Sequence, residues 1–449
     1  MTSLSGLLEA ARAELPAPSW AQWGSLLFSL SVFSFLISLA AAQALLALAS
    51  VFYIVQLLHA RTTVSFPPVK LPLALFCLFT LVSIGWAENA TVGWFAVRKL
   101  TLFVILLLGV NVVVSAKHLT LLYQGLFVES AVAGLVSVPQ FFALYRKARA
   151  SHPMQVYLYM TVERVHGFMG HWMNFGGQQM LIFAALLTFL LVATPGLGTR
   201  ARQGKMGKGG KGETVSSPVS ALPHLPSCFF SPFPLLWWLL LAIVILSLLL
   251  NFSRGVWLGC FVATIYLVGC WRPRWLWVLP LLMIVGLLLS PKLFRQRVQS
   301  LRQPSLDPSV SIRLEMWQVG LRMIRKHPWV GVGPNNISEV YTLYLPPGKA
   351  PEVGYREHLH NDFIQIGAER GLPCLAAWMW FMAALGWHSR RLRRKLKHFG
   401  WVADAAVAAW LAVLVEGSFE FNFGASPVLM LFLFIVSMPF AAEKLTVDG

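Results

Sequence analysis

Three short groups of residues in the second half of this 449-residue sequence combine charge with turn-forming residues. The first is Asn251-Phe252-Ser253-Arg254-Gly255, which lies between two apolar segments. Insertion of an arginine near the centre of a bilayer costs roughly 2.5–3.5 kcal/mol of free energy. Arg254 has almost no hydrophilic neighbours in the sequence, so we expect it to face a wet cavity or an anion. The alternative is that Arg254 extends its side chain to the membrane interface.

The second group surrounds Arg313. Residues Ser309 to Lys326 predict a helix, which ends at His327-Pro328. Such an amphipathic helix can lie on a membrane surface or cap a helical bundle. Taken alone, Arg313 has the alternative interpretation of a solvated helical arginine. The predicted apolar face consists of Ile312, Met316, Val319 and Met323.

The third group, from His358 to Asp362, immediately precedes an apolar segment. Asn361 or Asp362 can cap a helix that begins there, and the free N–H groups of such a helix end favour an anion. A histidine at this position can accept a proton near neutral pH. A metal site at His358 and His360 is a weaker alternative, because no carboxylate or third histidine accompanies them. We therefore predict a site without metal or other cofactor.

The composition indicates that membrane-spanning elements must position these groups. The chain is 57% hydrophobic and only 12% charged, whereas soluble domains are about one quarter charged. Apolar stretches of about 20 residues recur, and each can cross a bilayer as a helix. We predict one all-α polytopic transmembrane bundle over residues 1–449. The basic residues behind the net charge of +18 lie between the apolar segments. This position favours membrane lipid over nucleic acid as their partner.

Twelve apolar segments predict about 12 spans. Two of them, 71–86 and 256–270, are short, so tilt or re-entry is possible there. The segments are 20–39, 41–59, 71–86, 95–115, 119–144, 174–194, 235–251, 256–270, 275–290, 363–387, 401–418 and 424–442.

Basic residues in the short loops predict the orientation. An even number of spans places both termini on one side, and the basic clusters of that side predict that it is cytoplasmic. Residues 196–228, rich in Gly, Ser, Pro and Lys, are predicted to be a flexible basic cytoplasmic linker. The opposite face then carries a long loop, 291–362, between spans 9 and 10. The cytoplasmic clusters are Arg61, Lys70, Lys117, Arg200–Lys211, Arg272, Arg274 and Arg390–Lys397.

The long loop contains an excess of cations that the topology does not require. Long loops translocate largely regardless of charge, so these residues indicate an anionic partner at that surface. For the cluster from Arg295 to Arg302, attraction to anionic lipid headgroups is an equal alternative.

The segments NFSRGVWLG, SIRLEMWQVGLRMIRKHPWVGVGPNN and HLHNDFIQIGAERGL resemble the signature of the O-antigen ligase and polymerase superfamily. They stand in the family's order between Asn251 and Gly371, and the predicted topology is similar too. The resemblance implies a glycosyltransferase of the bacterial inner membrane. It implies transfer of a glycan from undecaprenyl diphosphate to an acceptor hydroxyl on the periplasmic side, by a metal-independent mechanism.

The resemblance also implies roles for particular residues. Arg254, Arg313 and His360 match the two arginines and the histidine that the family uses as key groups, although His358 leaves the histidine open by one register. Because a polyprenyl diphosphate is a good leaving group, the reaction needs cationic donors and a base for the acceptor hydroxyl. Direct displacement would invert the anomeric centre. The predicted substrate-binding residues are His358, Asn361, Asp362, Arg164, His171 and Arg322.

Several acceptors are compatible with this chemistry. The basic outer loop favours a ligase that joins a finished glycan to an acidic lipid acceptor such as lipid A-core. An O-antigen or exopolysaccharide polymerase would use the same donor, and a third member of the superfamily glycosylates protein hydroxyls. A transporter of lipid-linked sugars is less favoured, because no internal repeat is evident and the candidate groups cluster at one face.

Overall fold

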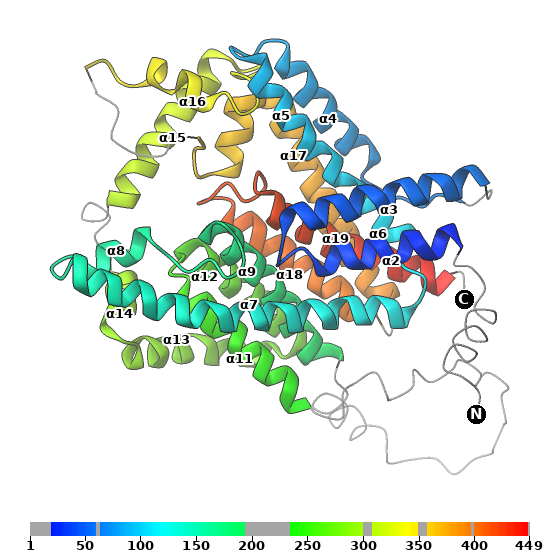
Figure 1. The fold of residues 1–449 in the computed structure, drawn as a ribbon, viewed down its shortest axis with the longest axis horizontal. Coiled ribbons are helices and arrows are strands. Elements are labelled where there is room, and N and C mark those ends of the chain that lie inside the picture. Colours follow the sequence, from blue (N-terminus) through cyan, green and yellow to red (C-terminus); the bar gives the residue numbers. More distant parts are fainter. Residues whose placement is uncertain are drawn as a thin grey trace, which may run out of the picture.

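The computed structural model describes residues 19–59, 63–193, 234–299, 308–348, 357–396 and 399–447. Throughout these ranges the protein is helical and contains no β-strand, which confirms the all-α class (Figure 1). The linker predicted at 196–228 lies outside the described residues.

A helix, or a run of two or three consecutive helices, is present at each of the twelve apolar segments. These are α2 (Trp20–Phe33), α3 (Leu39–His59), α4 (Lys70–Ile84), α5 (Ala90–Leu100) with η1 (Thr101–Phe103) and α6 (Val104–Asn111), α7 (Ala116–Ser151), α9 (Trp172–Thr188) with η2 (Phe189–Ala193), α11 (Pro234–Leu250), α12 (Arg254–Trp271), η4 (Pro273–Trp277) with α13 (Val278–Leu289), α17 (Asp362–Lys395), α18 (Gly400–Glu416) and α19 (Ser426–Val447). The other helices are α8 (Val156–Val162), α14 (Lys292–Gln299), α15 (Pro308–Lys326), α16 (Ile337–Val340) and η6 (Tyr341–Tyr344).

Six helices of the described chain are long and apolar enough to cross a membrane, which fits an all-α membrane protein. Twelve spans stay a prediction. The six helices begin at Leu39, Ala90, Ala116, Trp172, Arg254 and Ser426, and three shorter apolar helices begin at Lys70, Leu235 and Pro273.

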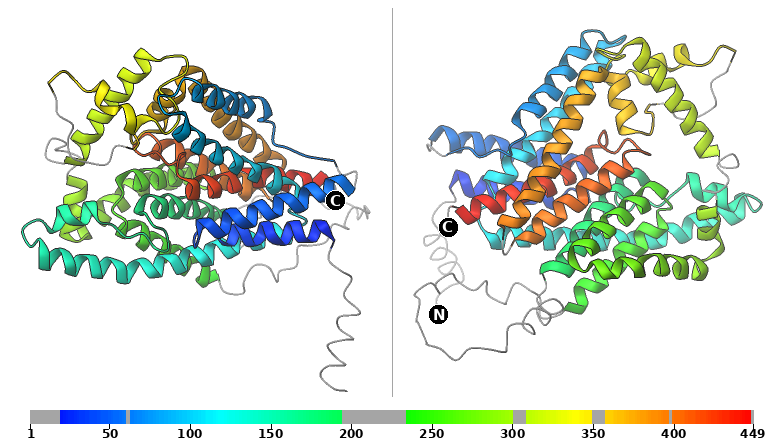
Figure 2. Two further views of the ribbon diagram at one scale, coloured as in Figure 1. Left: turned by 45° about the horizontal axis from the view of Figure 1, so that its top comes forward. Right: turned by 180° about the vertical axis from the view of Figure 1, so that it is seen from behind.

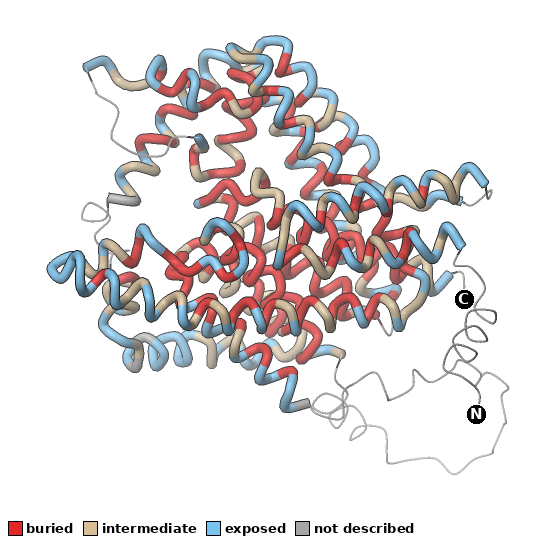
Figure 3. The backbone as a smooth tube through the Cα atoms, in the orientation of Figure 1, coloured by how far each residue is buried: buried red, intermediate tan, exposed pale blue. Residues whose placement is uncertain are grey.

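The outer surface of the bundle is apolar where lipid would contact it. On α3, the side chains of Leu48, Val51 and Ile54 are about half exposed. Exposure of apolar area to water costs roughly 25 cal/mol per Å², so lipid is the favourable surrounding for such a face. Figure 3 shows the corresponding pattern, with buried backbone in the centre and exposed stretches on the peripheral helices.

The centre of the bundle consists of α9, α18 and α19. The most apolar stretches of α9 with η2 and of α19 are each 83% buried. Helix α19, red in Figure 2, runs between other helices in both views. Gly259 of α12 faces Met180 of α9 and the carbonyl of Ala412 of α18. A β-carbon there would overlap the Met180 sulfur, so glycine lets the three helices approach closely.

A polar clamp fastens three helices at one end of the bundle. Tyr266 of α12 donates a hydrogen bond to Asp404 of α18 over 2.9 Å, and Arg393 of α17 donates to the same carboxylate. The carboxylate is buried and shared by two donors, so it fixes the relative position of the helices. The opposite ends of α12 and α17 carry the first and third sequence motifs.

The helix predicted over Ser309–Lys326 is present as α15. Met316, Val319 and Met323 on its predicted face are each at most 3% exposed. They pack against Tyr341 and Leu359 in a small core of their own. Helix α15 therefore buries its apolar face against protein at the end of the bundle, beside the start of α17.

Helix α17 breaks at Gly371, where φ is +81°. The chain after α15 docks against this break. The N–H of Val332 donates to the carbonyl of Ala368 over 2.9 Å, and the N–H of Leu372 donates to that of Pro328 over 2.7 Å. A β-carbon on Gly371 would overlap the carbonyl oxygen of Trp329. Glycine is thus required for both the left-handed backbone and the close approach.

We predict that Gly371→Ala destabilises the protein by roughly 1–3 kcal/mol, because alanine is strained in this conformation and would push the two segments apart. The midpoint of thermal unfolding in detergent measures this effect. Gly286→Ala is the matched control, since a β-carbon there meets no atom within 4 Å. Equal midpoints for the two variants would contradict the role given to Gly371.

Candidate active site

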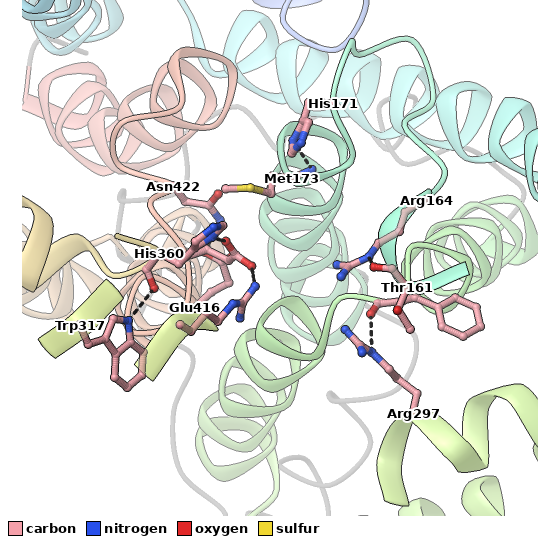
Figure 4. A network of polar contacts seen from close by, with 12 residues as sticks. Thr161, Arg164, His171, Met173, Arg297, Trp317, His360, Glu416 and Asn422 are labelled. Carbon is pink, nitrogen blue, oxygen red and sulfur yellow. Dashed lines mark hydrogen bonds and ion pairs between the residues drawn. The ribbon is translucent and has the colours of Figure 1, made fainter. Parts of the chain in front are cut away.

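The three motifs meet at one end of the bundle, around a carboxylate that the sequence did not single out. Glu420 lies in the loop between α18 and α19. One of its oxygens forms an ion pair with the Nη2 atom of Arg313. The other lies 2.6 Å from Nδ1 of His360. Glu420 therefore joins α15 to the segment that precedes α17, as the close-up in Figure 4 shows for His360 and its surroundings.

Glu420 is ionised in this position. Its side chain is 2% exposed, and burial by itself raises the pKa of a carboxyl. The charge of Arg313 and the bond to His360 outweigh burial and lower the pKa of Glu420 to about 2. A carboxylate only accepts hydrogen bonds, so Nδ1 of His360 must donate to it. A neutral His360 then has its free lone pair on Nε2, as a general base requires.

The backbone at His360 is held in an uncommon conformation. Its φ is +50°, a region that non-glycine residues rarely adopt. The neighbours of His360 stabilise this geometry: Trp317 donates from Nε1 to the His360 carbonyl over 3.4 Å, and the N–H of Leu359 donates to Gln365 over 2.7 Å. Phe252, in the first motif, also has a positive φ, at +57°. Such strain persists where the surroundings over-determine it, and it is common at functional sites.

Asn361 and Asp362 fasten the loop that carries Glu420. Asn361 caps α17 through its Oδ1, as predicted, and donates from Nδ2 to the carbonyl of Ser418 over 2.8 Å. The N–H of Asp362 donates to the carbonyl of Gly417 over 2.6 Å. Its carboxylate accepts from the N–H of Phe423 over 3.1 Å. These bonds fix the loop from both sides of Glu420.

Two further arginines face the pair of His360 and Glu420. Arg164 follows α8, donates from Nε to the carbonyl of Thr161 over 2.7 Å, and stacks 3.8 Å above the ring of Trp172. Arg297 of α14 donates from Nε to the carbonyl of Phe252 over 3.2 Å. In Figure 4 the guanidinium groups of Arg164 and Arg297 point toward the side where His360 lies.

The arginines share one electrostatic field. Burial lowers the pKa of Arg164 most, the charges of Arg297, Arg313 and Arg254 lower it further, and Glu420 opposes them. Arg254, at the first position of α12, therefore belongs to the same cluster. We call these four residues the arginine cluster. Glu420 pairs with Arg313 and acts on Arg164, and arginines gathered in this way favour an anionic ligand.

Asn251 joins the first motif to the segment that carries Arg164. Its Nδ2 donates to the carbonyl of Val165 over 3.2 Å and to that of Trp172 over 3.0 Å. The turn between α11 and α12 and the turn before α9 are thereby held together. This explains physically why an asparagine stands beside the SRG sequence.

The other two histidines of the predicted site, His171 and His358, lie beside the arginine cluster. His171 caps α9 by accepting from the N–H of Met173 over 3.2 Å. Burial lowers its pKa, with further contributions from Arg164 and His360 that Glu420 opposes. The His358 ring contacts that of His360 edge to face, with centroids 4.4 Å apart. Burial and the proximity of His360 lower the pKa of His358 to about 4. His358 is thus neutral at physiological pH, and His360 is the histidine bonded to Glu420.

Arg322 lies apart from the other predicted residues. Nine positions separate it from Arg313 on α15, or roughly 13 Å along the helix axis. It donates from Nη1 to the carbonyl of Tyr344 over 2.9 Å. Together with Arg325 and Lys326 it lines a separate basic cleft of about 360 Å³. The structure does not bring this cleft to the His360 site.

Sequence reasoning missed Glu420 and Asn251, and named Arg297 only as one of several loop cations. A signal for Glu420 existed. Glu420 lies in the short connection between apolar segments 401–418 and 424–442, and Glu416 lies near the end of the first of them. Their position in the predicted outer loop, opposite the excess of arginines, would have made them candidate partners.

Residues 239–379 match the family model described as O-antigen ligase. The expected superfamily is confirmed. The matched segment contains Arg254, Arg297, Arg313 and His360, whereas Arg164 and Glu420 lie outside it. The match supports a glycosyltransferase-like membrane enzyme of polysaccharide biosynthesis. A search among curated proteins found no match.

We predict that Glu420→Gln lowers stability at pH 7 by about 1–3 kcal/mol, because Arg313 would lose its charged partner in a buried site. The midpoint of thermal unfolding measures the loss. Glu443→Gln is the matched control: Glu443 accepts from Lys395 over 3.2 Å in an exposed pair, and such pairs contribute about 0–1 kcal/mol.

The pH dependence gives an independent check. The pKa of Glu420 falls from 4.5 to about 2 on folding, so its stabilising charge is fully present above pH 4.5. It is lost as the pH falls through about 2. The difference in stability between the wild type and Glu420→Gln should therefore shrink across this window. A constant difference would show that Glu420 is not ionised as described.

Proposed function

We propose that this protein is an O-antigen ligase-type glycosyltransferase. It transfers a glycan from undecaprenyl diphosphate to a hydroxyl of lipid A-core, or a similar acceptor, at the periplasmic face of the bacterial inner membrane. The observation that carries the proposal is the pairing of His360 with the buried Glu420 beside the arginine cluster.

The proposed step is a direct displacement. The acceptor oxygen attacks the anomeric carbon of the donor glycan, and the bond from that carbon to the diphosphate oxygen breaks. The acceptor proton passes to Nε2 of His360, while Glu420 stabilises the imidazolium that forms through its bond to Nδ1. The electron pair leaves with the diphosphate. Attack opposite the leaving group inverts the anomeric centre.

The arginine cluster stabilises the leaving group. Negative charge grows on the diphosphate as the bond breaks, and Arg254 and Arg313 are the donors assigned to it, with Arg164 beside them. Fixed cations in a buried site stabilise developing charge far more than water does. The proposed mechanism needs no metal or other cofactor, because the arginines supply the positive charge.

The arrangement of charged groups along the bundle supports the proposed orientation. The clamp of Arg393 and Asp404, together with Arg272 at the end of α12, lies at the end opposite the motifs. Basic residues concentrate on cytoplasmic ends. The His360 end would then face the periplasm, with both termini in the cytoplasm.

A polymerase that joins repeat units from the same donor is the second candidate, because His360 and the arginine cluster would serve either acceptor. The description of the matched family favours the ligase. A transporter of lipid-linked sugars is less favoured, since an ionised carboxylate that orients a histidine at one end of a bundle has no evident part in alternating access.

We predict that His360→Ala lowers kcat by about 10²–10⁴-fold through loss of the base. Arg254→Ala and Arg313→Ala should each lower it by about 10²–10³-fold through loss of charge stabilisation. The assay measures transfer of glycan from undecaprenyl diphosphate to lipid A-core by purified protein with EDTA present. His388→Ala and Arg391→Ala, at the far end of α17, are controls that should retain activity.

Each outcome of this assay decides between specific alternatives. Glycan that lengthens on the polyprenyl carrier, without transfer to lipid A-core, would identify a polymerase. Full activity in all three site variants would refute the site. Absence of transfer by the wild type to either acceptor, with flipping of the donor in vesicles, would replace the proposal by transport.

A further inference from the structure

A groove separate from the His360 site lies between α3 and the continuous helices α5, η1 and α6. Its volume is about 760 Å³. Apolar side chains, including Leu39, Leu46, Leu102 and Val104, form most of its walls. Arg98 and Lys99 line it as well. The groove is thus amphipathic, with apolar walls and a pair of adjacent cations.

The two cations lie in the interior of a candidate membrane span. Arg98 and Lys99 are in the middle of Ala90–Asn111, which is long and apolar enough to cross a bilayer. Among the described residues, neither forms an ion pair with a carboxylate. Cations within a span are costly in lipid and face a wet cavity or an anion. Glu369 and Glu357 partly offset the charge of Lys99, and the pair of cations along the groove still favours an anionic group in its occupant.

The groove reaches the site from the side that the arginine cluster does not occupy. Lys99 interacts electrostatically with Glu357, three residues before His360. Ser426, on another wall of the groove, begins α19 directly after the loop of Glu420. In Figure 1, α3, α5 and α6 lie to the right of α8, α12 and α14, which carry or adjoin the arginine cluster.

The two cationic sites are electrically distinct. The charges that act on Lys99 are those of Glu369, Arg370 and Glu357. Those that act on Arg164 come from the arginine cluster and Glu420. The two cationic sites therefore have different charged neighbours. A polyprenyl tail extending from the cluster would explain the apolar walls of the groove but would leave Arg98 and Lys99 unexplained.

We propose that this groove binds the lipid-linked acceptor, a phosphate-bearing glycolipid. Its hydrocarbon chains lie along α3, its phosphate lies at Arg98 and Lys99, and its sugar reaches His360 from the side opposite the donor. The identity of the acceptor rests on the proposed function. The position of a second phosphate-bearing lipid rests on the groove and its charges alone.

The test compares Arg98→Gln/Lys99→Gln with two matched double variants in the transfer assay. We expect the neutral pair to raise KM for phosphorylated lipid A-core by about tenfold or more, because two charge-assisted contacts are lost. KM for the donor should not change, and the difference should disappear with dephosphorylated lipid A-core. Arg98→Lys/Lys99→Arg retains both charges, so its KM for the acceptor should equal that of the wild type. Arg390→Gln/Arg391→Gln removes two exposed charges at the far end of α17 and should have no effect.

Three results would overturn the proposal: an unchanged KM for the acceptor, a raised KM for the donor instead, or an equal effect on phosphorylated and dephosphorylated acceptor. Native mass spectrometry of lipid A-core bound to the donor-free protein gives a readout that does not need transfer. If the wild type binds lipid A-core and the neutral pair does not, the groove is supported even where no transfer occurs. Failure of transfer in the wild type would instead count against the proposed function.

Discussion

The buried carboxylate of Glu420 is the group on which the candidate site depends. An ionised carboxylate at 2% side-chain exposure is stable only if cationic or protic partners surround it. Arg313 and His360 provide them from two segments that are otherwise separate. The same carboxylate fixes which nitrogen of His360 carries a proton. One electrostatic requirement thus determines the position of α15, the orientation of the histidine and its capacity as a base.

The helices around this group are built so that their ends stay in place. The far end is fastened by the carboxylate of Asp404, which Tyr266 and Arg393 share. Close packing at Gly259 leaves little freedom between α9, α12 and α18. The site end can therefore combine left-handed backbone at Phe252 and His360 with several buried charges. A rigid bundle offsets that local cost, since strain is retained only where neighbouring structure enforces it.

Local sequence patterns predicted the helices and their faces well. The period of Met316, Val319 and Met323 predicted α15 and its buried side, and Asn361 was recognisable as a cap. The motifs also predicted that Arg254, Arg313 and His360 act together. Periodicity carries no information about partners distant in the chain, so the pairing of Glu420 with Arg313 and His360 and the bonds of Asn251 could not be derived from it. Arg322 illustrates the converse: it shares a helix with Arg313, but nine positions place it roughly 13 Å away along the axis, where it lines a separate cleft.

The distribution of site residues along the chain has a consequence for modularity. The segment 239–379 that matches the family model supplies three arginines of the cluster and the histidine. Arg164 comes from before it, and the partner carboxylate comes from after it. Two of the three central helices, α18 and α19, also follow the matched segment. The recognisable part is therefore no autonomous catalytic unit. Exchanging it between relatives would keep the motif and break its electrostatic match, unless the short connection between α18 and α19 travelled with it.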